Sequence, residues 1–319
     1  MTTTRLRAPR LLLATGSVVA LLVVLLLAEF VVRLVAPQIL FAGTDRRLMR
    51  ENAFGSTYGW VPDATGICMG KTVSIGPDGF RNLPPHTGHA SLLLLGDSVT
   101  FGPGLEADST FAGMLQHSRP DIHIMNSAVI GYSLEHYRDV LASLVPRDST
   151  IRQVILCYSL NDYEPTIALG PEPQSFLWHI ASFLREHSTL YLFLKNLFFD
   201  RSETYFLHDY AHYRSPGVAA TLNLLDSVVT RAQSGGIPCT VLLLPCEYQL
   251  RKRDKRYLLP QQVVTAFCRT RNVAVIDAYH AFTDDGGPST AYFLYGDHMH
   301  LSGRGHRVVF RLLSPEVRL

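Results

Sequence analysis

The sequence lacks the cysteine and charge patterns of several common protein classes. Its five cysteines are an odd number without C-x-x-C spacing, so neither a zinc site nor a disulfide framework is indicated. Only 18% of residues are charged, and the formal net charge is +2. Nucleic acid is therefore not expected as a partner. The sequence has no internal repeat or low-complexity tract, and its 47% hydrophobic content indicates a packed globular protein.

A long hydrophobic run lies near the amino terminus. The 18 residues from Leu11 to Ala28 carry no charge, and apolar residues continue past Glu29. This length suffices to span a bilayer as a helix. A cleaved signal peptide is the alternative, but residues 34–36 put a bulky residue where small-x-small cleavage needs a small one. We therefore predict a retained transmembrane anchor over residues 11–35.

The residues around this run predict its orientation. Arg5, Arg7 and Arg10 precede it, with no acidic residue among the first ten. Basic residues favour the cytoplasmic side, so residues 1–10 are expected to form a cytoplasmic arm and the body to be extracytoplasmic, in the periplasm. Arg33 stands one helical turn after Glu29, so the two charges can pair within the helix.

Beyond the anchor, residues 36–89 are rich in Gly, Pro and polar residues and predict a lead-in of loops and short strands. The main domain is expected over residues 90–319. There, short apolar runs alternate with helix-like stretches, which predicts an α/β fold with a doubly wound parallel sheet of five strands. The expected strands are Ser91–Leu95, Ile122–Met125, Val154–Tyr158, Thr240–Leu244 and Val273–Ile276.

An insertion interrupts this alternation at about residues 163–216. It contains a mostly helical stretch with many large apolar side chains, between Phe176 and Phe198. Such a stretch is typical of a helical pair packed into the core. The alternative is a lid or a membrane-facing surface.

Three of the expected strands end in residues suited to acyl chemistry. In a parallel sheet these ends meet at one edge. Gly96 and Asp97 lead into Ser98, whose hydroxyl and backbone N–H a tight turn can expose. Gly131 follows the second strand and can bring its N–H close to a substrate, although it can equally be a turn residue. Asn161 follows the third, where its side-chain amide is an oxyanion donor or a helix cap.

A serine nucleophile needs a base and an orienting acid, and two D-x-x-H sequences offer them. Asp297 and His300 form the later pair, and Asp277 with His280 forms an earlier pair at the end of the last strand. We predict that the later pair serves Ser98. Metal binding by Asp297, His298 and His300 is disfavoured, because adjacent loop positions splay their side chains and no second cluster supplies further ligands. No metal and no cofactor are expected.

Taken together, these motifs resemble the SGNH (GDSL) hydrolase family, over about residues 76–313. The Gly96–Ser98 turn matches its nucleophile block, Gly131 its glycine block, Asn161 its asparagine block and Asp297 with His300 its terminal block. One departure is Ser159, which stands where the third block usually has glycine. The resemblance implies a three-layer α/β/α sandwich and catalysis by Ser98, His300 and Asp297. It also implies an oxyanion hole formed by Ser98, Gly131 and Asn161.

Ester chemistry on a carbohydrate or lipid, often an O-acetyl ester, is what this resemblance implies. We expect a serine esterase anchored in the membrane by its amino-terminal helix. Two alternatives remain open: an O-acyltransferase that uses the same triad on a cell-envelope polysaccharide, and a degenerate, membrane-tethered binding protein. The sequence identifies neither the acyl group nor the oligomeric state.

Overall fold

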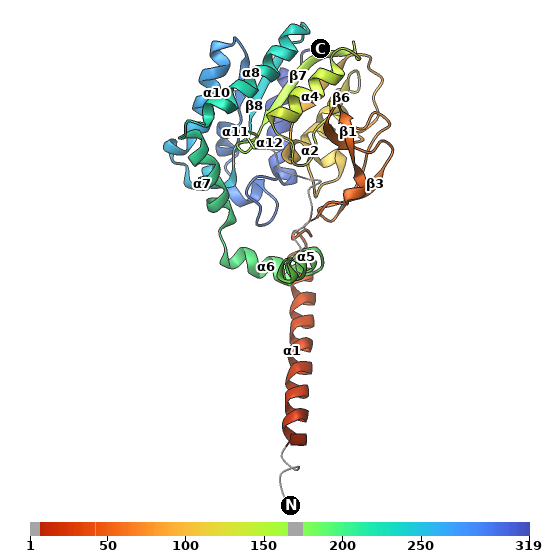
Figure 1. Cartoon of the computed structure of the whole chain (residues 1–319), viewed down its shortest axis with the longest axis vertical. Helices are drawn as coiled ribbons and strands as arrows, with labels where there is room; N and C mark the ends of the chain where they lie inside the picture. The colour runs from red at the N-terminus through yellow and green to blue at the C-terminus, as the bar shows by residue number, and fades with distance from the viewer. Residues whose placement is uncertain (1–6, 42, 165–174) are drawn as a thin grey trace, which may run out of the picture. The chain divides into compact units, whose positions relative to one another are not determined.

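The computed structural model describes residues 7–41, 43–164 and 175–319. The chain divides into two compact units (Figure 1). The smaller unit combines Met1–Phe41 with Pro173–Phe199, and the larger unit combines Ala42–Glu172 with Asp200–Leu319.

A parallel five-stranded sheet forms the centre of the larger unit. Its strands follow one another in space in the order β6-β5-β7-β8-β9, and every neighbouring pair is parallel. The chain enters at β5, adds β6 on one side and then continues on the other side from β7, so the strand order reverses at β5. This arrangement confirms the predicted doubly wound sheet. The strands are β5 (Ser91–Leu95), β6 (His123–Asn126), β7 (Ile151–Tyr158), β8 (Cys239–Leu243) and β9 (Ala274–Asp277).

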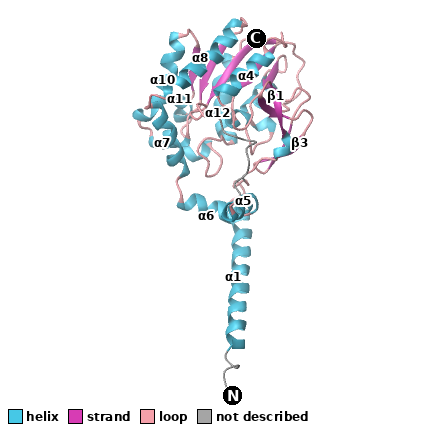
Figure 2. Cartoon of the chain, viewed as in Figure 1, coloured by secondary structure: helices cyan, strands magenta, loops and turns pink. Residues whose placement is uncertain are grey.

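Helices cover both faces of this sheet (Figure 2). Leu93 and Leu95 of β5 belong to one core cluster, together with side chains of α4 (Leu134–Leu144), α8 (Val218–Ser234) and α10 (Leu259–Thr270). Leu92 and Leu94 belong to a second cluster, with α3 (Phe111–Ser118), α11 (Tyr279–Asp284) and α12 (Gly303–Leu313). Because successive strand residues point to opposite faces, this alternation confirms the three-layer α/β/α sandwich.

The lead-in forms two antiparallel hairpins that share the core of the larger unit. They are β1 (Met49–Phe54) with β2 (Thr57–Trp60), and β3 (Thr65–Cys68) with β4 (Lys71–Ser74). Trp60 is only 1% exposed and donates a hydrogen bond to the Ala128 carbonyl at 2.9 Å. The buried Arg81 guanidinium donates to the carbonyls of Phe101, Gly102 and Leu105. This segment therefore supports the loops around the first two strands of the sheet.

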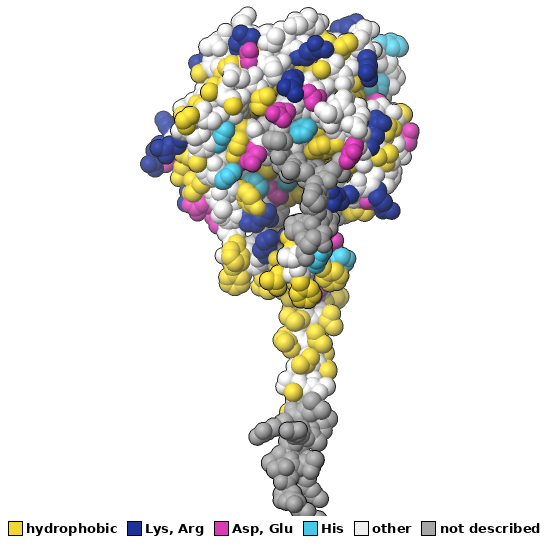
Figure 3. All heavy atoms as spheres, in the orientation of Figure 1, with side chains coloured by type: hydrophobic (Ala, Val, Ile, Leu, Met, Phe, Trp, Pro, Cys, Tyr) yellow, Lys and Arg dark blue, Asp and Glu magenta, His cyan; other side chains and the backbone are white. Residues whose placement is uncertain are grey.

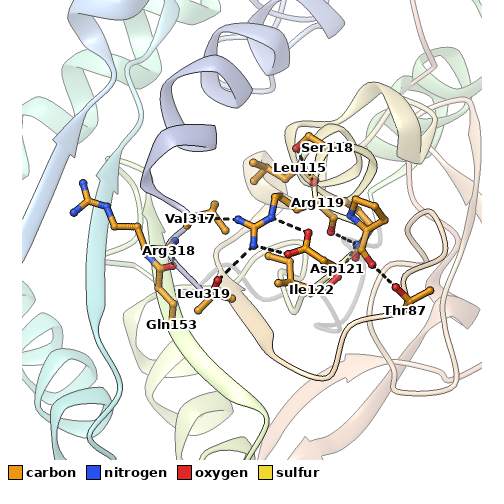
Figure 4. A network of polar contacts seen from close by, with 12 residues as sticks. Thr87, Leu115, Ser118, Arg119, Asp121, Ile122, Gln153, Val317, Arg318 and Leu319 are labelled. Carbon is orange, nitrogen blue, oxygen red and sulfur yellow. Dashed lines mark hydrogen bonds and ion pairs between the residues drawn. The ribbon is translucent and has the colours of Figure 1, made fainter.

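The carboxyl terminus is tied to the amino-terminal end of the sheet by a polar network (Figure 4). The Arg119 guanidinium makes a bidentate ion pair with the Asp121 carboxylate, with N–O distances of 2.8 and 2.7 Å. It also donates to the Val317 carbonyl at 3.2 Å. Gln153 of β7 donates to the Glu316 carbonyl at 3.0 Å. These contacts hold the last residues against the amino-terminal ends of the strands.

In its described residues, the smaller unit contains three helices. α1 (Arg7–Val35) includes Leu13–Val35, a segment long and apolar enough to cross a membrane. Of the predicted cytoplasmic arm, residues 1–6 lie outside the described residues, and the helix begins at Arg7. The insertion contributes α5 (Phe176–His187) and α6 (Thr189–Phe198), which confirms the predicted helices. The expectation that their apolar side chains are buried is wrong, because α5 has no buried residue and α6 has only Thr189 and Leu192.

Candidate active site

A tight turn after β5 presents Ser98 at the switch point of the sheet. Ser98 is the first residue of the short helix α2 (Ser98–Phe101), and Asp97 caps this helix by accepting a hydrogen bond from Val99 N–H at 2.9 Å. Gly96 is required here, because a Cβ at this position would lie 2.1 Å from Thr100 Oγ1. Ser98 is 8% exposed, so its side chain is largely shielded but not fully enclosed.

The later D-x-x-H sequence reaches Ser98 from the loop before α12. His300 Nε2 lies 2.8 Å from Ser98 Oγ, although the two residues are 202 positions apart. His300 Nδ1 lies 2.8 Å from Asp297 Oδ2. Asp297 Oδ1 also accepts the backbone N–H groups of Met299 and His300, each at 2.9 Å. The carboxylate thus fixes both the loop and the orientation of the imidazole.

The charges within this chain of hydrogen bonds favour an ionised Asp297 and a basic His300. Burial alone would raise the pKa of Asp297, but the His300 charge and its hydrogen bond outweigh burial and lower that pKa. Burial alone would lower the pKa of His300, but Asp297 and, more weakly, Asp97 raise it above its ordinary value. The imidazole is therefore set up to accept a proton from the serine hydroxyl.

The earlier D-x-x-H pair occupies a different environment. Asp277 is the last residue of β9 and accepts a hydrogen bond from Tyr279 N–H at 3.0 Å, while His280 is exposed on α11. In the described part of the chain, neither of them contacts Ser98 through a hydrogen bond. No group of three His, Cys, Asp or Glu residues is placed to hold a metal ion within the described residues.

Gly131 and Asn161 follow the strands on either side of β5. Gly131 adopts a φ of +81°, a backbone conformation that favours glycine. The loop before it is held to the turn that carries Ser98 by a hydrogen bond from Val129 N–H to the Gly96 carbonyl, at 3.4 Å. Asn161 follows β7, and its buried Oδ1 has no hydrogen-bond partner among the described residues. A buried amide whose oxygen is unpaired is suited to contact with a ligand.

Two buried carboxylates, which sequence reasoning did not assign, connect these loops. Asp97 accepts a hydrogen bond from the Ser159 hydroxyl at 3.2 Å, so the residue that replaces the usual glycine ties the third block to the nucleophile turn. Asp162 accepts Ser159 N–H and the Tyr137 hydroxyl, each at 2.9 Å. Burial, reinforced by Asp97, raises the pKa of Asp162 well above its usual value. The sequence shows that Asp97 precedes Ser98 and that Asp162 follows Asn161. It does not show which groups these two carboxylates contact.

α7 (Arg201–Tyr213) supplies further neighbours of the terminal block that the sequence did not indicate. The Tyr205 ring stacks on the His298 ring, with centroids 4.5 Å apart, and the Arg201 guanidinium lies over Tyr205. Burial lowers the pKa of His298 to about 4, so this imidazole is neutral near pH 7. Glu247 donates its backbone N–H to the His298 carbonyl at 2.9 Å. These residues brace the loop that carries His300 and Asp297.

One protein-family model matches more than half of the chain. A family model described as "GDSL-like Lipase/Acylhydrolase family" matches residues 94–308. No curated protein matches the chain. Among solved structures, a lipolytic protein of the G-D-S-L family from Veillonella parvula is similar over 72% of this chain and 100% of its own, with 15% identity and a TM-score of 0.46. An acetylxylan esterase from Geobacillus stearothermophilus is similar over 74% and 97%, with 14% identity and a TM-score of 0.46.

Proposed function

Because the chain belongs to the GDSL-like lipase/acylhydrolase family and is a serine hydrolase, we propose that it cleaves an acyl ester with Ser98, His300 and Asp297. Ser98 Oγ attacks the ester carbonyl while His300 Nε2 takes its proton. His300 then returns this proton to the leaving alcohol, and water releases the acyl group from Ser98 in the second half of the reaction. The single observation that carries this proposal is the hydrogen-bonded chain from Ser98 Oγ through His300 to Asp297, with both links at 2.8 Å.

The oxyanion formed during attack needs hydrogen-bond donors. We assign this role to the backbone N–H groups of Ser98 and Gly131 and to the Asn161 side-chain amide. The placement of Gly131 and Asn161 after β6 and β7, the two strands that flank β5 and Ser98, supports this assignment.

Replacing Asn161 with Ala is expected to lower kcat by about 10²–10³-fold, the usual cost of one lost oxyanion donor. Because Asn161 Oδ1 makes no hydrogen bond in the described structure, the thermal midpoint should change little. Steady-state kinetics with an aryl acetate and a melting curve test the two expectations. An unchanged kcat in a folded variant would remove Asn161 from the oxyanion hole.

The dependence of the rate on pH should report His300. Its neutral form is the general base, and Asp297 raises its pKa, so protonation persists to higher pH than for an ordinary histidine. The value of kcat/KM is therefore expected to rise with pH through an apparent pKa above about 6.5 and to fall away below it. A profile from about pH 5 to 9 tests this expectation. An acidic limb at or below the ordinary histidine value would contradict the assigned base.

The substrate we propose is an O-acetyl ester of a carbohydrate or lipid, as the family resemblance implies. The decisive experiment supplies an acetylated donor with and without an oligosaccharide acceptor. Free acetate as the product in both cases supports hydrolysis, and acetylated acceptor identifies an O-acyltransferase instead. A fluorophosphonate probe should label Ser98, whereas a degenerate binding protein would not react. Rates over a series of acyl chains, from acetate to palmitate, define the acyl group.

We also propose that α1 is retained as a membrane anchor, with the hydrolase domain on the periplasmic side. The length and composition of Leu13–Val35 support a span. Retention is supported by Glu29 of α1, which accepts hydrogen bonds from three residues of the insertion and is thus part of a folded unit. Protease digestion of intact spheroplasts should cut the hydrolase domain. Full protection would reverse the orientation.

A further inference from the structure

The insertion helices expose an unusual amount of large apolar surface. Outside α1, the exposed large hydrophobic side chains of the described residues are all at positions 176–199, except Ile67, Tyr205 and Leu207. Phe176 and Leu177 are each 76% exposed, and Phe198 is 73% exposed. Figure 3 shows hydrophobic side chains gathered over α5 and α6 and continuing onto α1. A contiguous apolar patch of this kind marks an interaction surface.

This patch is tied to α1 by the carboxylate of Glu29. Glu29 accepts hydrogen bonds from the Ser188 hydroxyl and from the backbone N–H groups of Thr189 and Leu190, at 2.8–2.9 Å. It also pairs with Arg33 at 2.7 Å, and Arg33 donates to the His187 carbonyl at 2.8 Å. The acid thus binds the amino terminus of α6, where a negative charge is favoured. Glu29 and Arg33 together bind the α5–α6 junction, residues 187–190, to α1 at positions 29–33.

This part of α1 lies close to the end of the apolar segment. Glu29 is six residues before Val35, about 9 Å along the helix at 1.5 Å per residue. The segment Leu13–Val35 is 23 residues long. Centred on a hydrocarbon core of about 30 Å, this segment of about 35 Å overhangs each end by about 2 Å, which places Glu29 about 7 Å below the boundary between acyl chains and headgroups. Interfacial helices bury their apolar faces to a similar depth, about 5–10 Å. Figure 1 shows α5 and α6 running across the axis of α1, as helices in the plane of a membrane would.

The remaining side chains of the two helices suit such a boundary. On α5, the guanidinium carbon of Arg185 lies 5.9 Å from the ring centroid of Trp178. On α6, the Lys195 ammonium nitrogen lies 6.0 Å from the ring centroid of Tyr191. Trp and Tyr with neighbouring cations are typical of the headgroup level, where one side of the ring is apolar and the other is wet.

We propose that α5 and α6 form an interfacial helix pair that lies in the outer surface of the lipid bilayer, held at the end of α1 by Glu29. The apolar face enters the acyl boundary and the cations meet the headgroups. We assign lipid as the binding partner of this patch for two reasons. The patch is continuous with the candidate membrane-spanning segment of α1, and Glu29 fixes it near the carboxyl-terminal end of that segment. This inference rests on α1 being an anchor, as proposed above, but not on the ester chemistry.

Tryptophan fluorescence tests this proposal directly, because the chain contains only two tryptophans. Trp60 is 1% exposed in the core of the larger unit, and Trp178 is on α5. The full chain is reconstituted in phosphatidylcholine vesicles carrying bromine either near the headgroups or deep in the acyl chains. We expect quenching that is stronger for the shallow bromines and that disappears in Trp178→Phe. Quenching no greater than that of Trp178→Phe would overturn the proposal.

A pair of surface variants provides a matched control. Phe176→Ser combined with Leu177→Ser removes two exposed apolar side chains from the patch, and Ile67→Ser removes a side chain that is 51% exposed on the larger unit. The first variant should reduce Trp178 quenching at least about twofold, and the second should leave it unchanged. Equal quenching in both would contradict insertion of the apolar face.

Vesicle flotation separates failure of the anchor from failure of the inference. A chain that does not float with the vesicles would refute the anchor and the interfacial pair together. A chain that floats but shows unquenched Trp178 would refute the interfacial pair alone, and cross-linking of α5 to a second copy would then identify the surface as an oligomer interface.

Discussion

Replacing Ser98 with Ala should abolish turnover of a simple aryl acetate, with a loss of kcat on the order of 10⁶-fold, as for other serine nucleophiles acting in a triad. In the proposed mechanism Ser98 Oγ forms the bond to the acyl carbon, and Ala leaves no nucleophile in its place. The fold should survive, because the turn depends on Gly96 and on the Asp97 cap rather than on the hydroxyl. Purified full-length protein in detergent, assayed by stopped-flow or by prolonged steady-state measurement, gives the rate.

Ser118→Ala serves as a matched control, because Ser118 is an exposed serine at the end of α3 in the same unit. It should retain wild-type activity and should not alter labelling by a fluorophosphonate. Undiminished activity in a folded Ser98→Ala variant would remove the nucleophile assignment and, with it, the mechanism proposed here.

The second large effect is expected at Asp297. Asp297→Asn should lower kcat by about 10⁴-fold, because an amide in place of the carboxylate favours the wrong tautomer of His300. The geometry should persist, since an amide oxygen can still accept the N–H groups that Asp297 Oδ1 accepts. The acidic limb of the residual activity should also move to lower pH, because the charge that raises the pKa of His300 is removed.

Asp277→Asn is the natural control, because Asp277 begins the other D-x-x-H sequence and is, like Asp297, partly buried. Its carboxylate accepts Tyr279 N–H in the turn before α11, a bond that an amide oxygen can also accept, so the variant should lose no more than about 1 kcal/mol of stability and keep its kcat. A large loss of kcat in Asp277→Asn, together with little change in Asp297→Asn, would reverse the assignment of the two pairs.

The local sequence does not determine which of the two D-x-x-H pairs contacts Ser98. Both have the same spacing, and each could orient a histidine on a single turn. The choice of Asp297 and His300 came from resemblance to a family. Only the packing of α12 and its preceding loop against β5 brings His300 within 2.8 Å of Ser98 Oγ, a contact between residues 202 positions apart.

The insertion shows the converse case, in which composition predicted helices correctly but burial incorrectly. Large apolar residues at helical spacing favour α5 and α6 whether their faces meet a protein core or lipid. Local sequence does not distinguish a helix face buried in a protein core from one that contacts lipid, because both environments are apolar. The contact of Glu29 with α6 joins residues about 160 positions apart, and the exposure of the apolar side chains of α5 and α6 is evident only in the folded unit.

By itself, the sequence determined the elements and their chemistry: five strands with alternating helices, an apolar amino-terminal helix, and Ser98, Gly131 and Asn161 at successive strand ends. These features depend on local hydrophobic periodicity and on residue type, which the sequence records directly. The tertiary structure alone decided the strand order, the histidine that contacts Ser98 Oγ, the buried link from Ser159 to Asp97 and the exposed face of α5 and α6. Each of these features depends on which distant segments pack together. That packing is determined by how apolar side chains from the whole chain are buried together, not by any single segment.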